Sequence, residues 1–218
     1  MRRILFSLTM LKSRRFLIKK YSKEWFERFS ALSKRYFNEL LTKLPDIGES
    51  IFSFNYKFAP AYIAWYRALA DTGVSGSEAD ETLWRMNEAL FTAVPSPLLH
   101  TVGKAYLNGF RKKASAHAQR QSSGSLHPYD WRIEYRDVDA NCFEIDITEC
   151  AFKKLAVEYG TEGLLPGICR IDYLSANLMG NGFERTKTLG DGDDCCNCRY
   201  YVTGSCEWSP EKGFTDRK

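Results

Sequence analysis

The chain of 218 residues is 44% hydrophobic and 27% charged, which excludes a disordered or fibrous protein and indicates a globular fold. The length allows one domain or two small ones. Residues 1–120 carry 20 Lys/Arg against 10 Asp/Glu, whereas residues 121–218 carry 11 against 17. Because nucleic-acid phosphates require a basic surface, the acidic second half excludes nucleic acid as its partner.

The first 20 residues contain seven Lys/Arg and no acidic residue. The apolar run from Ile4 to Leu11 is short and no small-residue cleavage site follows it, so we predict no signal peptide. No segment reaches the roughly 18 apolar residues of a membrane span. A helix here either contacts an anionic membrane surface or is solvated and partly frayed. Seven cysteines, an odd number, without a secretion signal predict a cytoplasmic protein with free thiols.

Apolar residues recur at three- and four-residue spacing in the first half, which predicts helices. The predicted helices cover residues 21–44, 57–71, 75–91 and 98–118. The aromatic stripe of the last helix, which includes Tyr106 and Phe110, indicates an inter-helix core or the wall of a ligand cavity.

Residues 130–202 show a different pattern. Alternation at 131–136 and 142–147 predicts two strands, 151–159 and 164–179 are predicted helices, and 183–189 and 196–202 are predicted strands. The fold class is therefore α+β: an N-terminal helical bundle-like half followed by a β-β-α-α-β-β module with an antiparallel sheet. The predicted division is a helical region at 1–118, a polar linker at 119–129, the module at 130–202 and a loose tail at 203–218.

The cysteines in Cys195-x-x-Cys198 have the spacing of half a zinc site, but no second pair accompanies them. Strand alternation would also place Cys196 and Cys198 on one face and Cys195 on the other. We therefore predict no metal site and no evident cofactor, and we interpret Cys196 and Cys198 as small buried hydrophobic residues.

Two acidic residues are candidates for chemistry. Asp172 lies within an otherwise apolar predicted helix, so it is exposed, paired with a cation such as Arg170 or Arg199, or placed in a pocket as a general base or a binder of cations. Glu149 follows a predicted strand, where Glu149 and Cys150 would face a pocket and Thr148 would cap the next helix.

Four phrases together resemble the L-2-amino-thiazoline-4-carboxylic acid hydrolase family. They are Thr148-Glu149-Cys150-Ala151-Phe152, Leu164-Leu165-Pro166 through Cys169-x-x-Asp172-Tyr173, Arg185-Thr186-x-Thr188, and Gly192-x-x-x-Cys196-x-x-Arg199. The last phrase has Asn197 and Cys198 where the family pattern is Cys-Asp-Phe-Arg. The resemblance covers roughly residues 130–202.

The resemblance implies a hydrolase that opens a small cyclic amidine or isothiourea by attack of water on the carbon between sulfur and nitrogen. The expected catalytic residues are Asp172 or Glu149 as the base and Cys196 as a pocket-lining residue or, second, a nucleophile. The expected substrate-binding residues are Arg199, Arg185, Thr186 and Cys150. No metal ligands are evident, although a divalent metal ion could polarise the substrate.

A second hypothesis is a non-catalytic sensor domain, because the module also resembles the vinyl-reductase type of small-molecule-binding domain. A deep cavity with apolar walls and no convergent carboxylate would favour a sensor, and a water-filled cavity containing both Asp172 and an arginine would count against it. The expected partner is a small molecule in either case, with membrane-surface contact through the basic N-terminus or homo-oligomerisation as further possibilities.

Overall fold

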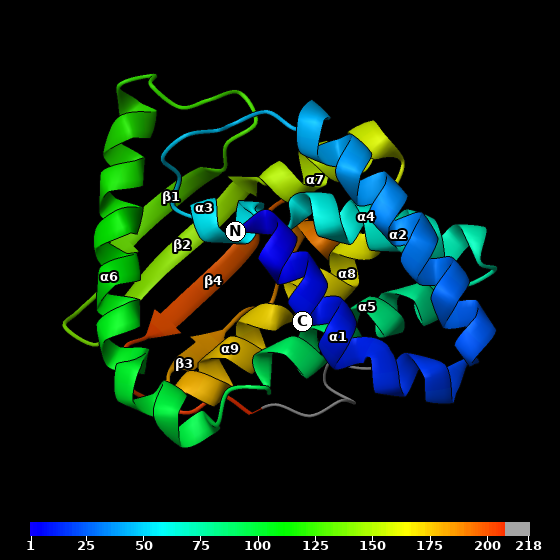
Figure 1. Ribbon diagram of the computed structural model, residues 1–218. Helices are drawn as coiled ribbons and strands as arrows, with labels where there is room; N and C mark the ends of the chain where they lie inside the picture. Colours follow the sequence, from blue (N-terminus) through cyan, green and yellow to red (C-terminus); the bar gives the residue numbers. More distant parts are fainter. Residues whose placement is uncertain (208–218) are drawn as a thin grey trace.

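A computed structural model describes residues 1–207 of the chain. Its first half is helical (Figure 1). The helices are α1 (Arg2–Lys20), α2 (Lys23–Lys43), α3 (Ser53–Tyr56), α4 (Ala59–Asp71), α5 (Gly76–Phe91) and α6 (Ser96–Ser122). These bounds agree with the four helices expected from the apolar spacing and with the helix considered for the first 20 residues, and they add α3.

The helix α1 is packed rather than frayed. Its Phe6 ring stacks on Phe37 of α2, with the ring centroids 4.3 Å apart, and on Trp65 of α4 at 5.6 Å. Ser22 starts α2 by accepting a 3.0 Å hydrogen bond from the backbone N–H of Trp25, which satisfies one of the free donors at the helix start. The three helices therefore share one apolar interior.

The second half forms a four-stranded antiparallel sheet, which confirms the α+β fold class. Its strands are β1 (Arg132–Asp137), β2 (Cys142–Glu149), β3 (Gly182–Glu184) and β4 (Cys196–Tyr201), in the order β1-β2-β4-β3. On β4 the predicted alternation is confirmed, because Cys196, Cys198 and Tyr200 are all buried. Phe110 of α6 packs against the same face, with its ring centroid 5.3 Å from that of Tyr200.

Three helices connect the two pairs of strands: α7 (Ala151–Tyr159), α8 (Leu165–Cys169) and α9 (Ile171–Met179). The single helix predicted over 164–179 is wrong, because the chain breaks at Arg170. The break places Asp172 in the first turn of α9, where the positive end of the helix dipole favours a carboxylate. Gly160 and Gly180 end α7 and α9 in the left-handed conformation, as glycine does best.

The helical half and the sheet share one hydrophobic core that extends from Phe6 to Cys206. The predicted linker is partly helical, since α6 continues to Ser122. Residues 203–207 have no helix or strand, but Cys206 is buried and its carbonyl accepts a 2.8 Å hydrogen bond from Asn177. The rest of the predicted tail, 208–218, lies outside the described residues. None of the described helices combines the length and apolarity that crossing a bilayer requires.

The contact between α6 and α9 depends on Gly103. A Cβ atom at this position would lie 2.1 Å from the backbone carbonyl oxygen of Met179, so Gly103→Ala is expected to destabilise the fold by about 1–3 kcal/mol. Gly109 lies on the same helix with open space around it, so Gly109→Ala is expected to be neutral or stabilising by up to about 1 kcal/mol. Urea unfolding of both variants tests the prediction, and equal midpoints would contradict it.

Candidate active site

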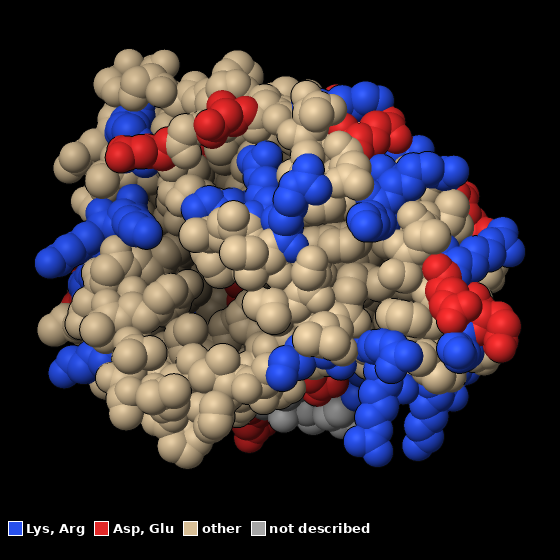
Figure 2. All heavy atoms as spheres, viewed as in Figure 1, with Lys and Arg blue, Asp and Glu red and all other residues tan. Residues whose placement is uncertain are grey.

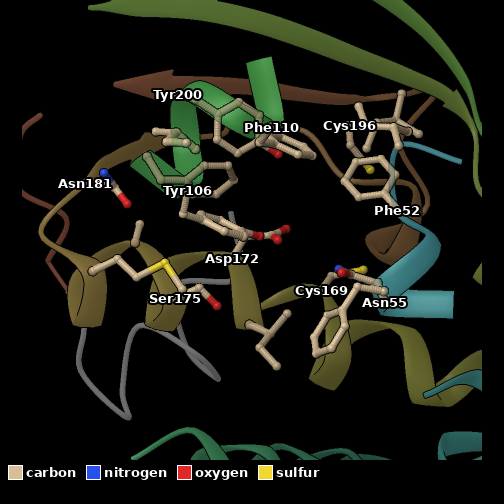
Figure 3. Close-up of a pocket in the computed structure, with 18 of the residues that line it drawn as sticks. Phe52, Asn55, Tyr106, Phe110, Cys169, Asp172, Ser175, Asn181, Cys196 and Tyr200 are labelled. Atoms are coloured by element: carbon tan, nitrogen blue, oxygen red, sulfur yellow. The ribbon is translucent and has the colours of Figure 1, made fainter. Parts of the chain in front are cut away.

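A cavity of about 390 Å³ lies between the helical half and the sheet. Its size falls in the range of small-molecule sites, about 300–1,000 Å³. Figure 3 shows that the labelled side chains come from both halves of the chain and surround Asp172. The lining is largely aromatic and aliphatic and includes Phe52, Phe58, Tyr62, Tyr106, Phe110, Trp131, Ile147, Phe152, Ile168, Phe183 and Tyr200.

Asp172 is the acidic residue of the cavity lining, and it is paired with Arg185. The guanidinium Nη1 of Arg185 donates to Asp172 Oδ2 at 3.0 Å. The Arg185 side chain is 2% exposed, whereas that of Asp172 is 32% exposed and opens into the cavity. Of the alternatives left open by the sequence, Asp172 is both paired with a cation and placed in a pocket, but the cation is Arg185 and neither Arg170 nor Arg199, which were named as examples. Arg185 therefore fixes the Oδ2 atom of Asp172 from the side that faces away from the cavity.

Two opposing effects act on the pKa of Asp172. Burial raises this pKa above its ordinary value, because the ionised carboxylate loses hydration, and the charge and hydrogen bond of Arg185 offset part of the increase. The net direction is upward. A carboxyl group with a raised pKa is a stronger base when it is ionised, which suits proton transfer near neutral pH.

Arg185 is fixed in place by contacts other than its ion pair. Its Nη2 donates to the carbonyl oxygen of Cys169 at 3.0 Å, and the guanidinium lies over the rings of Tyr173 and Phe183, 5.3 and 5.5 Å from their centroids. The phenol of Tyr173 donates back to the Arg185 carbonyl oxygen at 3.0 Å. Arg185 is therefore built to orient Asp172, with little surface left to contact a substrate.

Three cysteines line the cavity: Cys150, Cys169 and Cys196. Burial raises the pKa of the Cys150 thiol to about 11 and also raises that of Cys169, so neither thiol is ionised at neutral pH. The Cys196 sulfur accepts a hydrogen bond from the backbone N–H of Leu189 at 3.2 Å and lies 3.5 Å from the Thr188 hydroxyl. Cys196 therefore joins β4 to the loop that precedes it.

The other predicted site residues lie outside the cavity lining. Glu149 was expected to face a pocket, but a β-bulge at Thr148 breaks the alternation, and both residues are exposed. The carboxylate of Glu149 pairs instead with Lys154 Nζ at 2.6 Å. Thr148 does not cap α7, because its hydroxyl donates to the carbonyl of Arg132.

Arg199 and Thr186 are likewise on the surface. Arg199 faces outward on β4, and its Nε donates to Glu144 Oε1 at 2.7 Å. Thr186 lies in the loop after β3, where Asn197 binds it. The side-chain oxygen of Asn197 accepts from the backbone N–H groups of Thr186 and Lys187, and its nitrogen donates to the Thr186 hydroxyl. At the position where the sequence departs from the family pattern, Asn197 thus fixes this loop.

The helical half also supplies residues to the cavity lining. Tyr106 and Phe110 of α6 both line the cavity, as one of the two interpretations of their aromatic stripe expected, and Phe110 packs against the hydrophobic core as well. Lys113, one turn further along α6, lies exposed at the edge of the cavity. Lys113 follows Gly109 by four residues and Phe110 by three, so it lies on the same side of the helix as these two lining residues. This spacing is the sequence signal that could have indicated Lys113 as a residue of the cavity.

No cluster of three or more His, Cys, Asp or Glu side chains within residues 1–207 is placed to hold a metal ion. The chain is thus an α+β protein with a cavity that contains a carboxylate held by a buried arginine. Residues 55–200 match the L-2-amino-thiazoline-4-carboxylic acid hydrolase family. The chain belongs to this family, which confirms the resemblance read from the four phrases. A comparison with curated proteins finds no match.

Proposed function

We propose that the protein is a hydrolase that opens a small cyclic amidine or isothiourea, with L-2-amino-thiazoline-4-carboxylate as the substrate to test first. The observation that supports this function is Asp172: Arg185 holds Oδ2, and no hydrogen bond to Oδ1 is found among the described residues. A carboxylate oxygen at a cavity wall suits either deprotonation of a water molecule or binding of an amidinium group.

In the proposed reaction, Asp172 accepts a proton from water as the water oxygen bonds to the ring carbon between sulfur and nitrogen. The C=N bond opens and its nitrogen takes up a proton. The C–S bond then breaks as the added oxygen loses its remaining proton and becomes the carbonyl oxygen, and the departing sulfur takes a proton. The attacking water supplies both protons, the first by way of Asp172, and the ring carbon keeps both nitrogens. The product of the 2-amino-thiazoline is N-carbamoyl-cysteine. Arg185 contributes by orienting Asp172 and by keeping it ionised at a lower pH than burial alone would allow.

The substrate carboxylate requires a cation other than Arg199, which faces outward. Lys113 is the cation at the edge of the cavity that remains accessible, since Arg185 is buried. Lys113→Gln is expected to raise KM roughly three- to tenfold with little change in kcat, because the exposed ion pair it would form is weak. Lys112→Gln, which changes an exposed neighbour outside the cavity lining, is the matched control and should leave both constants unchanged.

Incubation of the purified full chain with L-2-amino-thiazoline-4-carboxylate tests the function, with N-carbamoyl-cysteine followed by mass spectrometry. This readout is preferable to a thiol reagent because all seven cysteines of the protein are free. Parallel reactions with and without divalent metal ions determine whether a metal contributes. Absence of product in every reaction would reject this substrate. The free thiols also suit a reducing cytoplasm, the location that we expect.

Cys196→Ala separates hydrolysis by water from covalent catalysis. Because the Cys196 sulfur is engaged with Leu189 and Thr188, we expect the variant to keep kcat within about threefold and to lose about 1 kcal/mol of stability. The activity of the variant and its thermal unfolding are the measurements. A loss of activity of a hundredfold or more in a folded variant would instead support a nucleophilic thiol.

The apolar wall supports a second candidate, a sensor that binds a small molecule without breaking a bond. Aromatic residues such as Phe52, Phe110 and Trp131 suit retention of a ligand as well as exclusion of water. A sensor would be stabilised against thermal unfolding by a ligand that is recovered unchanged. Conversion of the same ligand to a product would support the hydrolase and reject the sensor.

A further inference from the structure

The helix α1 exposes an apolar stripe opposite the face that it buries. Phe6, Met10 and Leu17 face the core, whereas Ile4 and Leu11 are 62% and 66% exposed. Met1 and Leu8 are also exposed, so the stripe repeats at three- and four-residue spacing along one side of the helix. A helix that is already anchored in the core has no structural need for apolar residues on its outer side.

Further exposed apolar side chains lie on α6 and α3. They are Leu98, Val102 and Tyr106 on α6, in one row at four-residue spacing, and Phe54 on α3. Figure 2, in the same view as Figure 1, shows a hollow in the surface between α6 and α1. Phe54 and Tyr106 line the cavity itself. We call Met1, Ile4, Leu8, Leu11, Phe54, Leu98, Val102 and Tyr106 the docking face.

Basic residues flank the α1 part of the docking face. Arg3, Lys12, Arg14 and Arg15 are exposed, and the helix contains no acidic residue. Among the described residues, the ion pair found for a base of α1 is that of Lys20 with Glu78 at 3.7 Å. Figure 2 shows blue side chains toward both ends of α1, with largely uncharged surface over its middle and around the hollow.

Apolar side chains rimmed by bases that form no ion pair within residues 1–207 fit one kind of partner, a membrane with anionic lipids. The apolar residues would enter the headgroup boundary, and each base would gain attraction from lipid phosphate or carboxylate groups. A second copy of the chain fits less well, because the same basic rim would meet itself and repel. The described helices are unsuited to crossing the bilayer, so the contact would be interfacial.

We propose that the docking face binds an anionic membrane surface and that the mouth of the cavity opens toward that surface. An amphipathic ligand can then reach Asp172 from the interface without crossing bulk water. The apolar wall of the cavity, from Phe54 at the mouth to Trp131 inside, suits such a ligand. This proposal concerns location and access, and it stands whether the cavity is catalytic or a sensor.

Sedimentation of the full chain with vesicles tests the proposal at low salt. Vesicles of phosphatidylcholine alone are compared with vesicles of equal parts phosphatidylcholine and phosphatidylserine. We expect binding to the anionic vesicles, at least about tenfold weaker binding to the neutral ones, and loss of binding as salt is raised. No binding to either vesicle at low salt, or equal binding to both, would overturn the proposal.

Substitutions locate the surface. Leu11→Glu is expected to weaken binding at least about tenfold, because it removes an apolar side chain that would enter the membrane and adds repulsion from anionic lipid. Val157→Glu makes the same change at a residue of α7 that is 57% exposed and outside the docking face, so it should bind nearly as the unchanged protein does. Equal loss in both variants would overturn the assignment to α1.

Val102→Glu tests whether α6, and with it the cavity mouth, faces the membrane. We expect a weakening comparable to that of Leu11→Glu, since Val102 is 48% exposed on the docking face and does not line the cavity. Binding unchanged by Val102→Glu would overturn the placement of the mouth. Light scattering completes the test: a dimer that Leu11→Glu converts to a monomer would make a second copy the occupant and overturn the proposal.

Discussion

Replacement of Asp172 by Asn is expected to lower kcat for L-2-amino-thiazoline-4-carboxylate by about 10²–10⁴-fold, the contribution typical of a positioned general base. Asn keeps an oxygen that can accept the 3.0 Å hydrogen bond from Arg185, so the geometry of the pair is preserved. What the substitution removes is the ability to take a proton. Steady-state kinetics with mass-spectrometric detection of N-carbamoyl-cysteine measure the effect.

The same variant distinguishes the two roles open to Asp172. If the carboxylate binds the amidinium group of the substrate and does not deprotonate water, Asn removes the negative charge that attracts the substrate. KM then rises by a larger factor than kcat falls. If it is the base, kcat falls and the activity that remains loses its dependence on the ionisation of Asp172. Kinetics at several pH values separate these outcomes.

Glu149→Gln is the matched control, because Glu149 is the other carboxylate that the sequence indicated as a base. It lies outside the cavity and pairs with Lys154, so its loss should leave kcat within about twofold. Unchanged kcat in Asp172→Asn, with turnover present, would remove Asp172 from the mechanism. Loss of activity in Glu149→Gln would show that the cavity is not the site of the chemistry.

Most elements of the fold follow closely from local rules, although the strand predicted at 183–189 is wrong beyond Glu184, where β3 ends. Apolar spacing predicts α2 and α4 within two residues of their observed ends, and Gly160 and Gly180 end their helices where expected. The break at Arg170 did not follow, because residues 164–179 are apolar on both sides of it. A buried arginine there, which donates to the carbonyl of Pro166, is a tertiary contact that periodicity does not contain.

The site was predictable where strand alternation continues and not where it is interrupted. Phe183 is buried, Glu184 is exposed and Arg185 is buried again, so period two from Phe183 already indicates that Arg185 faces inward. Glu149 was misplaced because one bulge reverses that parity. The sequence could not show that Arg185, rather than another arginine, pairs with Asp172. That pairing depends on how the loop after β3 and the helix α9 lie relative to each other, and spacing along the chain does not contain this information.

Replacement of Arg185 by Met is expected to destabilise the protein by about 2–3 kcal/mol at neutral pH. Loss of one partner from a buried ion pair typically costs about 3–5 kcal/mol, and the smaller value follows because a third of the Asp172 side chain contacts solvent. Met retains apolar contact with Tyr173 and Phe183, which separates the charge effect from a cavity effect. Urea unfolding measures the difference.

The pH dependence of this variant has a definite sign. Burial already raises the pKa of Asp172, and without the guanidinium the pKa rises further. The folded variant then keeps a proton on Asp172 that the unfolded chain releases, so its stability is greatest at low pH and declines as pH rises through the folded pKa. The acid limb of kcat/KM, which requires ionised Asp172, therefore moves to higher pH. A positioning role for Arg185 is contradicted if this limb stays in place.

The double variant Asp172→Asn with Arg185→Met separates pairing from packing. If Arg185 stabilises the fold chiefly by compensating Asp172, removal of both charges costs less than the sum of the single changes, because neither partner remains buried alone. We expect a coupling of about 1–2 kcal/mol in that direction. Additive losses would mean that the contacts of Arg185 with Cys169, Tyr173 and Phe183 hold the site by themselves. Asp172 would then owe its position to α9, and its reactivity to burial rather than to its partner.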